Sequence, residues 1–160
     1  MRQTGVETSR PRAESPEPKA HAMLPGVRVD RPSEFSLTVE RSRFYALLTP
    51  LASPDAMDAL LKARRKDYRK ANHHCWACRV RDAAGAVIEL SKDDGEVGHP
   101  GRVLLELLKK NDLEAAIVVS RIFGGVKLGV GGVSRAFRDA GQGAINAVAP
   151  HPPPARPRGR

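Results

Sequence analysis

Glycine and basic residues occur together in the segment 121–137, RIFGGVKLGVGGVSRAF, a combination that could bind an anion. Five of the nine residues from Gly124 to Gly132 are glycine, and Arg121, Lys127 and Arg135 are spaced through and around them. Glycine lets backbone N–H groups approach a ligand, and the N-terminus of a following helix favours negative charge. One or two glycines would be enough for a tight turn, so the segment predicts an anion-binding loop. The residues that we expect to contact the anion are Arg121, Gly124, Gly125, Lys127, Gly129, Gly131, Gly132 and Arg135.

Two known nucleotide-binding patterns do not fit this segment. Gly124 and Gly129 have the separation of the Walker pattern, but Val130 stands where that pattern requires lysine. Gly129 and Gly131 begin a dinucleotide-binding pattern that would require glycine in place of Ser134. The segment therefore predicts a strand, a glycine-rich loop and a helix, without a P-loop or a dinucleotide fingerprint.

The segment HHCWAC, residues 73–78, contains the side-chain types of a zinc site. On a strand, however, residues i and i+3 point to opposite faces, so Cys75 and Cys78 cannot bind one ion without a bend. No second ligand pair follows, and we expect no metal here. His73 lies at the start of this predicted strand, where it is either a structural residue or a group that faces a cleft.

The acidic turn DDGE, Asp93 to Glu96, lies between a predicted strand and a predicted helix. Acidic glycine turns bind divalent cations in many proteins, but no acidic residue occupies the twelfth position that an EF-hand loop requires. Aspartate and glycine are also common turn residues. Taken alone, this motif favours a turn over a metal site.

The remaining pattern predicts the elements that position these motifs. Phe35, Leu37 and Val39 alternate with polar residues and predict a strand. Further strands are expected at 43–48, in a hairpin of 74–81 with 86–90, and in the apolar run 115–119, and helices after Ser53, after Pro100 and from about Ser134 to Val148. The order ββαββαβα predicts an α+β domain with its helices on one face of a mostly antiparallel sheet.

Basic residues dominate the end of the first predicted helix, in KARRKDYRK at residues 62–70. Cations near a helix C-terminus complement the helix dipole, and Asp58 can pair with Lys62 one turn later. The alternative is that this run faces RNA or phosphate.

Composition indicates a single small domain with two tails. The net charge is +9, but residues 32–148 contain 18 Lys/Arg against 14 Asp/Glu, a net +4. Residues 1–31 and 149–160 are rich in proline and arginine and are expected to be disordered, which leaves 32–148 as the folded domain. No apolar run approaches the roughly 20 residues of a membrane span, and the two cysteines fit a reducing compartment. We therefore expect a cytoplasmic protein.

Three segments together resemble the IMPACT/YigZ family. RIFGGVKLGVGGVSRAFRDA is similar to its signature R-[YF]-F-G-G-[IV]-K-L-G-x-G-G-L-x-R-A-[YF], HHCWACR resembles its H-N-C-Y-A-[YW]-R strand, and DDGE resembles its D-D-G-E-P loop. They occur in the family order, over about residues 42–148. The resemblance implies a two-layer fold like the second domain of small-subunit ribosomal protein five. It also implies that the loop shares one surface with His73, Arg79, Asp93, Asp94 and Glu96.

This chain departs from the family pattern in two places. The family continues D-D-G-E-P-x-G-T-A-G-[KR]-P, whereas VGHPGRV is one residue shorter here and lacks the threonine. Long bacterial members also carry a second, ferredoxin-like domain that is not found in this sequence. Binding is therefore expected through the single domain, through a partner or through an oligomer.

The resemblance leaves two classes of function open. Eukaryotic members of the family act in translational control and stress responses, and bacterial members are usually described as candidate nucleic-acid binders. We therefore expect a non-enzymatic module without a cofactor, whose loop contacts RNA phosphate, the ribosome or a translation-related protein. The alternative is a phosphotransfer enzyme, because small-molecule kinases share the fold. In that case Asp93, Asp94 or Glu96 would hold Mg²⁺, Lys127 would neutralise phosphate and His73 would be the base.

Overall fold

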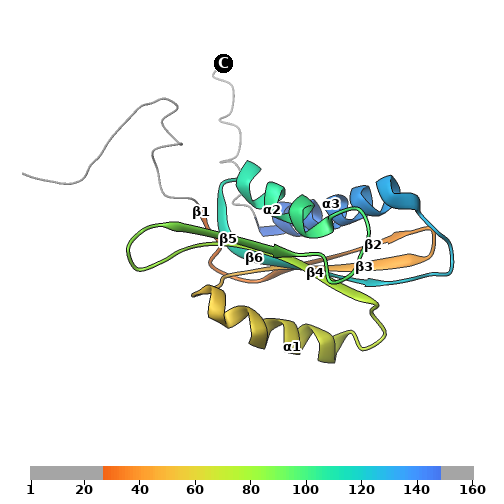
Figure 1. Cartoon of the computed structure of the whole chain (residues 1–160), viewed down its shortest axis with the longest axis horizontal. Coiled ribbons are helices and arrows are strands. Elements are labelled where there is room, and N and C mark those ends of the chain that lie inside the picture. The colour runs from red at the N-terminus through yellow and green to blue at the C-terminus, as the bar shows by residue number, and fades with distance from the viewer. Residues whose placement is uncertain (1–26, 149–160) are drawn as a thin grey trace, which may run out of the picture.

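The computed structural model describes residues 27–148 of the chain, which form one sheet between two layers of helices (Figure 1). The strands are β1 (Val27–Arg28), β2 (Ser33–Val39), β3 (Ser42–Thr49), β4 (His73–Arg81), β5 (Val87–Lys92) and β6 (Leu113–Ile122). The helices are α1 (Met57–Asp67), α2 (Pro100–Lys110) and α3 (Gly129–Val148), and a 3-10 turn at Pro54–Ala56 precedes α1. None of these helices is long and apolar enough to cross a bilayer.

The strands run in the order β2-β3-β6-β4-β5, and every pair along this path is antiparallel. β6 lies at the centre and is buried over nine of its ten residues, as its apolar run predicted. The α+β class and the mostly antiparallel sheet are therefore confirmed.

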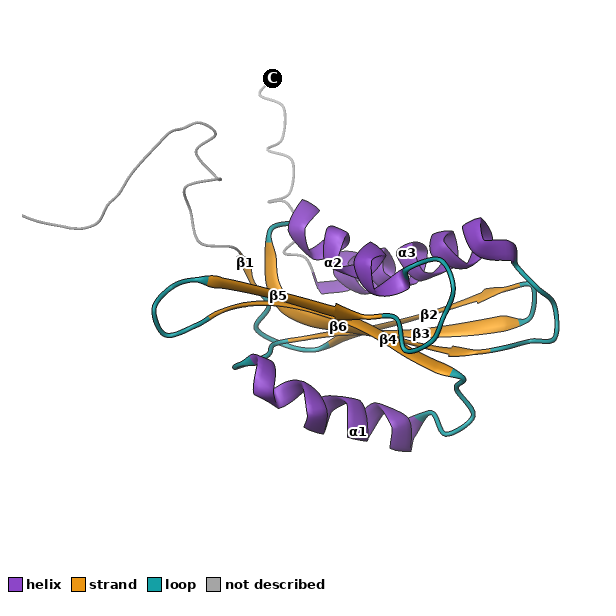
Figure 2. Ribbon diagram, in the orientation of Figure 1, coloured by secondary structure: helices purple, strands orange, loops and turns teal. Residues whose placement is uncertain are grey.

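Helices cover both faces of the sheet, which corrects the prediction that all of them lie on one face. α2 and α3 pack on one face, where the rings of Phe44 and Phe137 meet edge to face at 5.1 Å. α1 packs on the other face, where Leu61 contacts a core that contains Trp76 and Val118 (Figure 2). Because both faces of β4 and β6 are apolar, a sheet with one bare face would expose this second core to water.

The domain begins earlier than the predicted boundary at residue 32. β1 pairs in parallel with the start of β6, and Val29 is buried in the core that α2 and α3 cover. Residues 27–31 therefore belong to the folded unit. The rest of both predicted tails, residues 1–26 and 149–160, lies outside the described residues.

α3 begins at Gly129, five residues before the predicted start at Ser134. Glycine is a weak helix former, so propensity alone placed Gly131 and Gly132 in the loop. Val133 and Ser134 hold this turn in place, because Val133 is buried and the hydroxyl of Ser134 donates a hydrogen bond to the carbonyl oxygen of Gly98 (2.6 Å). Three glycines of the predicted loop therefore form the first turn of the helix.

Candidate functional site

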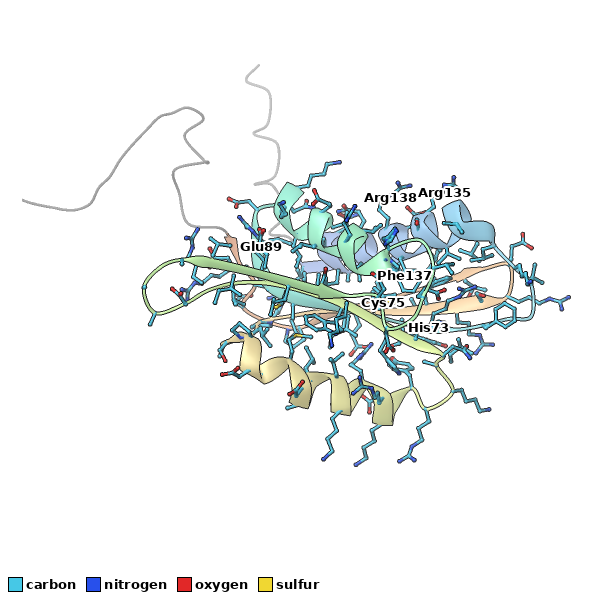
Figure 3. The ribbon with its side chains drawn as sticks, in the orientation of Figure 1. His73, Cys75, Glu89, Arg135, Phe137 and Arg138 are labelled. Atoms are coloured by element: carbon cyan, nitrogen blue, oxygen red, sulfur yellow. The ribbon has the colours of Figure 1, made fainter. Side chains whose placement is uncertain are left out.

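Several of the predicted site residues meet at one end of the sheet. His73 at the start of β4 pairs with Arg121 near the end of β6, and Arg121 pairs on its other side with Phe44 of β3. The glycine loop therefore leaves the sheet beside the start of β4. The loop from β5 to α2, which contains DDGE, is connected to the start of α3 by the Ser134–Gly98 hydrogen bond. His73 and Cys75 lie near this loop in Figure 3.

A buried ion pair connects the DDGE turn to the glycine segment. Arg121 Nη1 lies 2.9 Å from Glu96 Oε2, and these two side chains are only 7% and 4% exposed. Arg121 Nη2 also donates to the hydroxyl of Ser42 at 3.3 Å, and the guanidinium lies over the rings of Phe44 and Phe123. Arg121 was predicted to contact an anion, but its charge is compensated by Glu96 inside the domain.

His73 completes this cluster from the solvent side. Its Nδ1 lies 2.8 Å from the carbonyl oxygen of Asp94, which can only accept, so Nδ1 carries a proton. Its Nε2 lies 3.7 Å from Glu96 Oε2. Cys75 lies behind His73 and donates from Sγ to the carbonyl oxygen of Asp93 at 3.1 Å. Burial, reinforced by the neighbouring carboxylates, raises the pKa of Cys75 well above its ordinary value, so this sulfur stays a thiol.

The carboxylates of DDGE are engaged within the fold. Asp93 accepts from the amide of Gly101 and Asp94 from the amide of His74, each at 2.8 Å, while Glu96 binds Arg121. In residues 27–148 no three or more His, Cys, Asp or Glu side chains form a group that could hold a metal ion. This geometry does not support the alternative of a phosphotransfer enzyme in which the DDGE turn holds Mg²⁺.

The two cysteines of the zinc-like motif lie on opposite faces of β4, as predicted. Cys75 belongs to the core under α2 and α3, and Cys78 belongs to the core under α1.

The glycine loop is anchored at its start. The amide of Phe123 donates to Asn72 Oδ1 at 2.8 Å, and the amide of Gly124 donates to Ser42 Oγ at 3.2 Å. Gly124 also packs directly against the backbone of Arg41, where any larger residue would collide with the turn between β2 and β3. These two amides are therefore not available to a ligand.

The rest of the loop exposes its glycines, although Val126 and Leu128 are half-buried and Leu128 packs against the core. Within the described part of the chain, the amides of residues 125–131 have no hydrogen-bond acceptor outside α3, and an α-helix gives its first N–H groups no internal acceptor. Gly125, Gly129 and Gly131 are exposed, and no atom lies within 4 Å of the position that a Cβ would take on any of them. Gly129 has a φ of +75°, which a residue with a side chain rarely adopts.

Lys127 and Arg135 lie together beside these amides. Both side chains are exposed, and both line one hollow of about 290 Å³. Glu40 and Asp139 line the same hollow, so it carries both signs of charge. Among the ion pairs of residues 27–148, none includes Lys127 or Arg135. Figure 3 shows Arg135 on α3, on the outer side of the helix layer.

Arg79 lies far from this end of the sheet. It follows His73 by six residues on β4, which is about 20 Å along an extended strand. Its guanidinium binds Glu89 and Asp112, each at 3.1 Å. The implied common surface therefore contains His73 and the DDGE turn, but Arg79 belongs to the opposite end.

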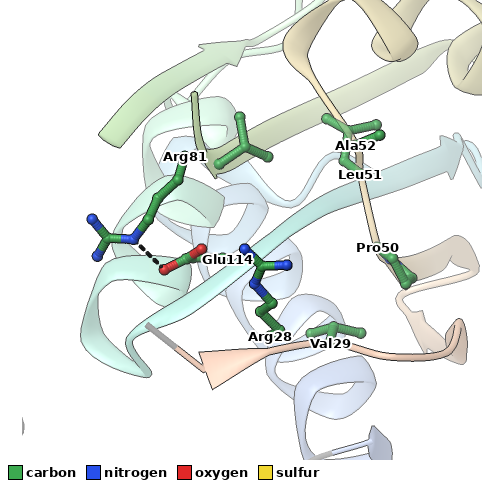
Figure 4. Close-up of a pocket in the computed structure, with 8 residues that line it drawn as sticks. Arg28, Val29, Pro50, Leu51, Ala52, Arg81 and Glu114 are labelled. Carbon is green, nitrogen blue, oxygen red and sulfur yellow. Dashed lines mark hydrogen bonds and ion pairs between the residues drawn. The ribbon is translucent and has the colours of Figure 1, made fainter. Parts of the chain in front are cut away.

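A second hollow of about 290 Å³ lies between β1, β4 and β6, beneath the turn after β3 (Figure 4). Arg28 and Arg81 flank Glu114 there, and Arg81 Nε donates to Glu114 at 2.8 Å. It contains none of the predicted site residues.

Sequence reasoning missed Ser42, Asn72 and Ser134, which fix the loop and the start of α3. Asn72 and Ser134 each make one hydrogen bond of this kind, and the hydroxyl of Ser42 accepts from both Arg121 and Gly124. In every case the partners are at least 36 positions apart in the sequence. No local pattern in the sequence indicates such contacts.

Comparison with known proteins places the chain among relatives with this architecture. The family model described as the Impact N-terminal domain matches residues 40–145. An IMPACT family member of Thermus thermophilus is 41% identical over 100 residues, which is 62% of this chain and 52% of the relative.

Two solved structures are also similar. A crystal structure of a hypothetical protein matches with a TM-score of 0.66 and 28% identity, over 73% of this chain and 58% of that one. The two-domain translational regulator Yih1 matches with a TM-score of 0.50 and 27% identity, over 84% of this chain and 54% of Yih1. The chain thus spans a little over half the length of these proteins. It belongs to the IMPACT family, and residues 40–145 are its Impact N-terminal domain.

Proposed function

We propose that this protein is a non-enzymatic regulatory or binding module of translation, and that its glycine loop binds an anionic group on RNA or on a translation-related protein. The observation that carries the proposal is the run of amides without acceptors at residues 125–131, beside Lys127 and Arg135. Amides at a helix N-terminus and neighbouring cations attract the same ligand, a phosphate or a carboxylate.

Arg121 and Glu96 support this loop from inside the domain. Their ion pair joins the end of β6 to the DDGE turn, and Gly98, two residues after that turn, accepts a hydrogen bond from Ser134 in the second turn of α3. The strand before the loop is therefore held by a buried ion pair, and the helix after it by a partly buried hydrogen bond. In this proposal Arg121 positions the loop, and Lys127 and Arg135 contact the ligand.

Similarity to known proteins supports translation as the process. Yih1, described as a translational regulator, shares the fold at 27% identity. A role in translation follows for this chain only as part of the proposal, because the chain spans 54% of Yih1. The cytoplasm, where translation occurs, is the compartment that the proposal requires.

A pull-down with the full chain from a cell lysate, with and without nuclease, tests the proposal. Lys127→Gln/Arg135→Gln removes both loop cations, and Arg102→Gln/Lys110→Gln removes two exposed cations of α2 as a matched control. We expect ribosomal RNA or translation proteins with the wild type and the control, and a strong loss with the loop variant. Loss after nuclease identifies RNA as the ligand, and persistence identifies a protein. Equal capture by the loop variant and the wild type would contradict the proposal.

A further inference from the structure

A stripe of four basic side chains runs along α1 and the turn that follows it, on the face of the sheet opposite to α2 and α3. Lys62, Arg65 and Lys66 have the spacing i, i+3 and i+4, which places them on one side of α1, and Arg69 follows in the turn after the helix. All four are exposed, and nitrogen-tipped side chains extend from α1 away from the sheet in Figure 3. We call these four residues the α1 stripe.

The α1 stripe has no acidic partner in the described structure. No ion pair among residues 27–148 includes any of its four members, and the expected pair of Asp58 with Lys62 does not form. The stripe also places the like charges of Lys62 and Lys66 one helical turn apart, and such pairs repel each other. The helix dipole favours cations only in the last turn, so it does not account for Lys62.

A fifth cation lies behind the stripe. Arg64 is only 3% exposed, and its Nε and Nη2 atoms have no hydrogen-bond partner. The guanidinium lies 4.7 Å from the ring centre of Tyr68, which stacks on Tyr45 at 4.5 Å. An aromatic ring stabilises this charge without neutralising it, so Arg64 adds to the positive potential at α1.

We propose that the α1 stripe binds the phosphate backbone of a structured RNA. Lys62 to Lys66 spans about 6 Å of helix and Arg69 follows in the next turn, so the stripe is long enough to face about four phosphates of one strand of a duplex. Tyr45 and Tyr68 already stack on each other, so this face offers charge rather than free aromatic rings for reading bases. This proposal uses residues outside the glycine loop and does not depend on the function proposed for that loop.

The test is a salt titration of the full chain with a fluorescently labelled RNA duplex, read by anisotropy. Four phosphate contacts predict a fall in affinity on the order of 100-fold between about 50 and about 200 mM salt, because each contact releases counterions. Lys62→Gln/Lys66→Gln leaves two contacts, so the fall should shrink to about 10-fold and the salt slope should drop by about 2. Arg102→Gln/Lys110→Gln, with the same change in net charge, should keep the wild-type slope.

Two further measurements distinguish the loop from the α1 stripe and RNA from an acidic protein. In the background of Lys127→Gln/Arg135→Gln, where the loop contributes no phosphate contacts, Lys62→Gln/Lys66→Gln should still lower the salt slope by about 2, so failure of the loop proposal and failure of this one are distinguishable. Polyglutamate at equal charge concentration should compete weakly against the duplex. The proposal is overturned if the duplex does not bind at low salt, if the α1 and α2 variants behave alike, or if polyglutamate competes as well as unlabelled duplex.

Discussion

Removing the carboxylate of Glu96 should destabilise the domain more than any single change at an exposed ion pair. Glu96→Gln keeps the shape of the side chain and an oxygen that can accept a hydrogen bond, but it leaves the charge of Arg121 buried without its anionic partner. Arg121 Nε already has no partner, so no spare acceptor is present to compensate. Breaking a buried pair by removing one member costs about 3 to 5 kcal/mol.

The matched control is Glu89→Gln, which breaks the pair of Glu89 with Arg79. These side chains are 31% and 14% exposed, so water replaces the lost contact and the expected cost is about 1 kcal/mol or less. Urea unfolding followed by circular dichroism gives both free energies of unfolding. For a domain of this size, a loss of about 3 kcal/mol should lower Tm by roughly 10 °C.

A second variant distinguishes the loss of stability caused by the unpaired charge from a loss caused by altered packing. In Glu96→Gln/Arg121→Met the unpaired charge is gone, so the double variant should recover much of the stability lost in Glu96→Gln. A cost for Glu96→Gln as small as that for Glu89→Gln would refute the view that the Arg121–Glu96 pair holds this end of the sheet together.

Three further changes test the fold and the environment of the site. Gly124→Ala should cost about 1 to 3 kcal/mol in thermal unfolding, because its methyl group would collide with the backbone of Arg41, whereas Gly131→Ala points into open space and should cost little. Leu61→Ala should cost about 2 to 5 kcal/mol in urea unfolding if α1 is a full member of the fold, and a change below about 1 kcal/mol would contradict that packing. Burial lowers the pKa of His74 below its ordinary value of 6.5. As the pH falls, the unfolded chain therefore takes up this proton at a higher pH than the folded domain does. Stability should therefore fall as the pH drops below 6.5, and His74→Gln should flatten that pH profile; an unchanged profile would exclude His74 as its source.

Local patterns in the sequence were sufficient to predict most elements of the fold. The alternation in β2 and the apolar run of β6 each reflect a burial requirement that can be recognised from neighbouring residues in the sequence. Gly141 of α3 lies so close to Leu104 and Leu107 of α2 that a larger side chain would require these leucines to move. The placement of α1 was missed, although Trp76 and Cys78 already formed an apolar face opposite to Cys75 and Ala77.

The candidate site was less predictable, because its decisive contacts are long-range. Glu96 and Arg121 are 25 positions apart in the sequence, so no local pattern indicates that Glu96 neutralises this arginine. Arg79 and His73 share a strand and a motif, but strand geometry places them at opposite ends of the sheet. The open amides of the loop followed from the glycine pattern, whereas the anchoring of Phe123 and Gly124 depends on Asn72 and Ser42.

The central claim is that the loop amides bind an anion, and a backbone amide NMR titration with inorganic phosphate tests it most directly, with chloride at equal ionic strength as the reference. Gly125, Gly129 and Gly131 should shift with phosphate, and the shifts should disappear in Lys127→Gln/Arg135→Gln. Phe123 and Gly124, whose amides are already bonded, should stay nearly fixed. Phosphate-dependent shifts that lie elsewhere, or no shifts at residues 125–131, would contradict the account.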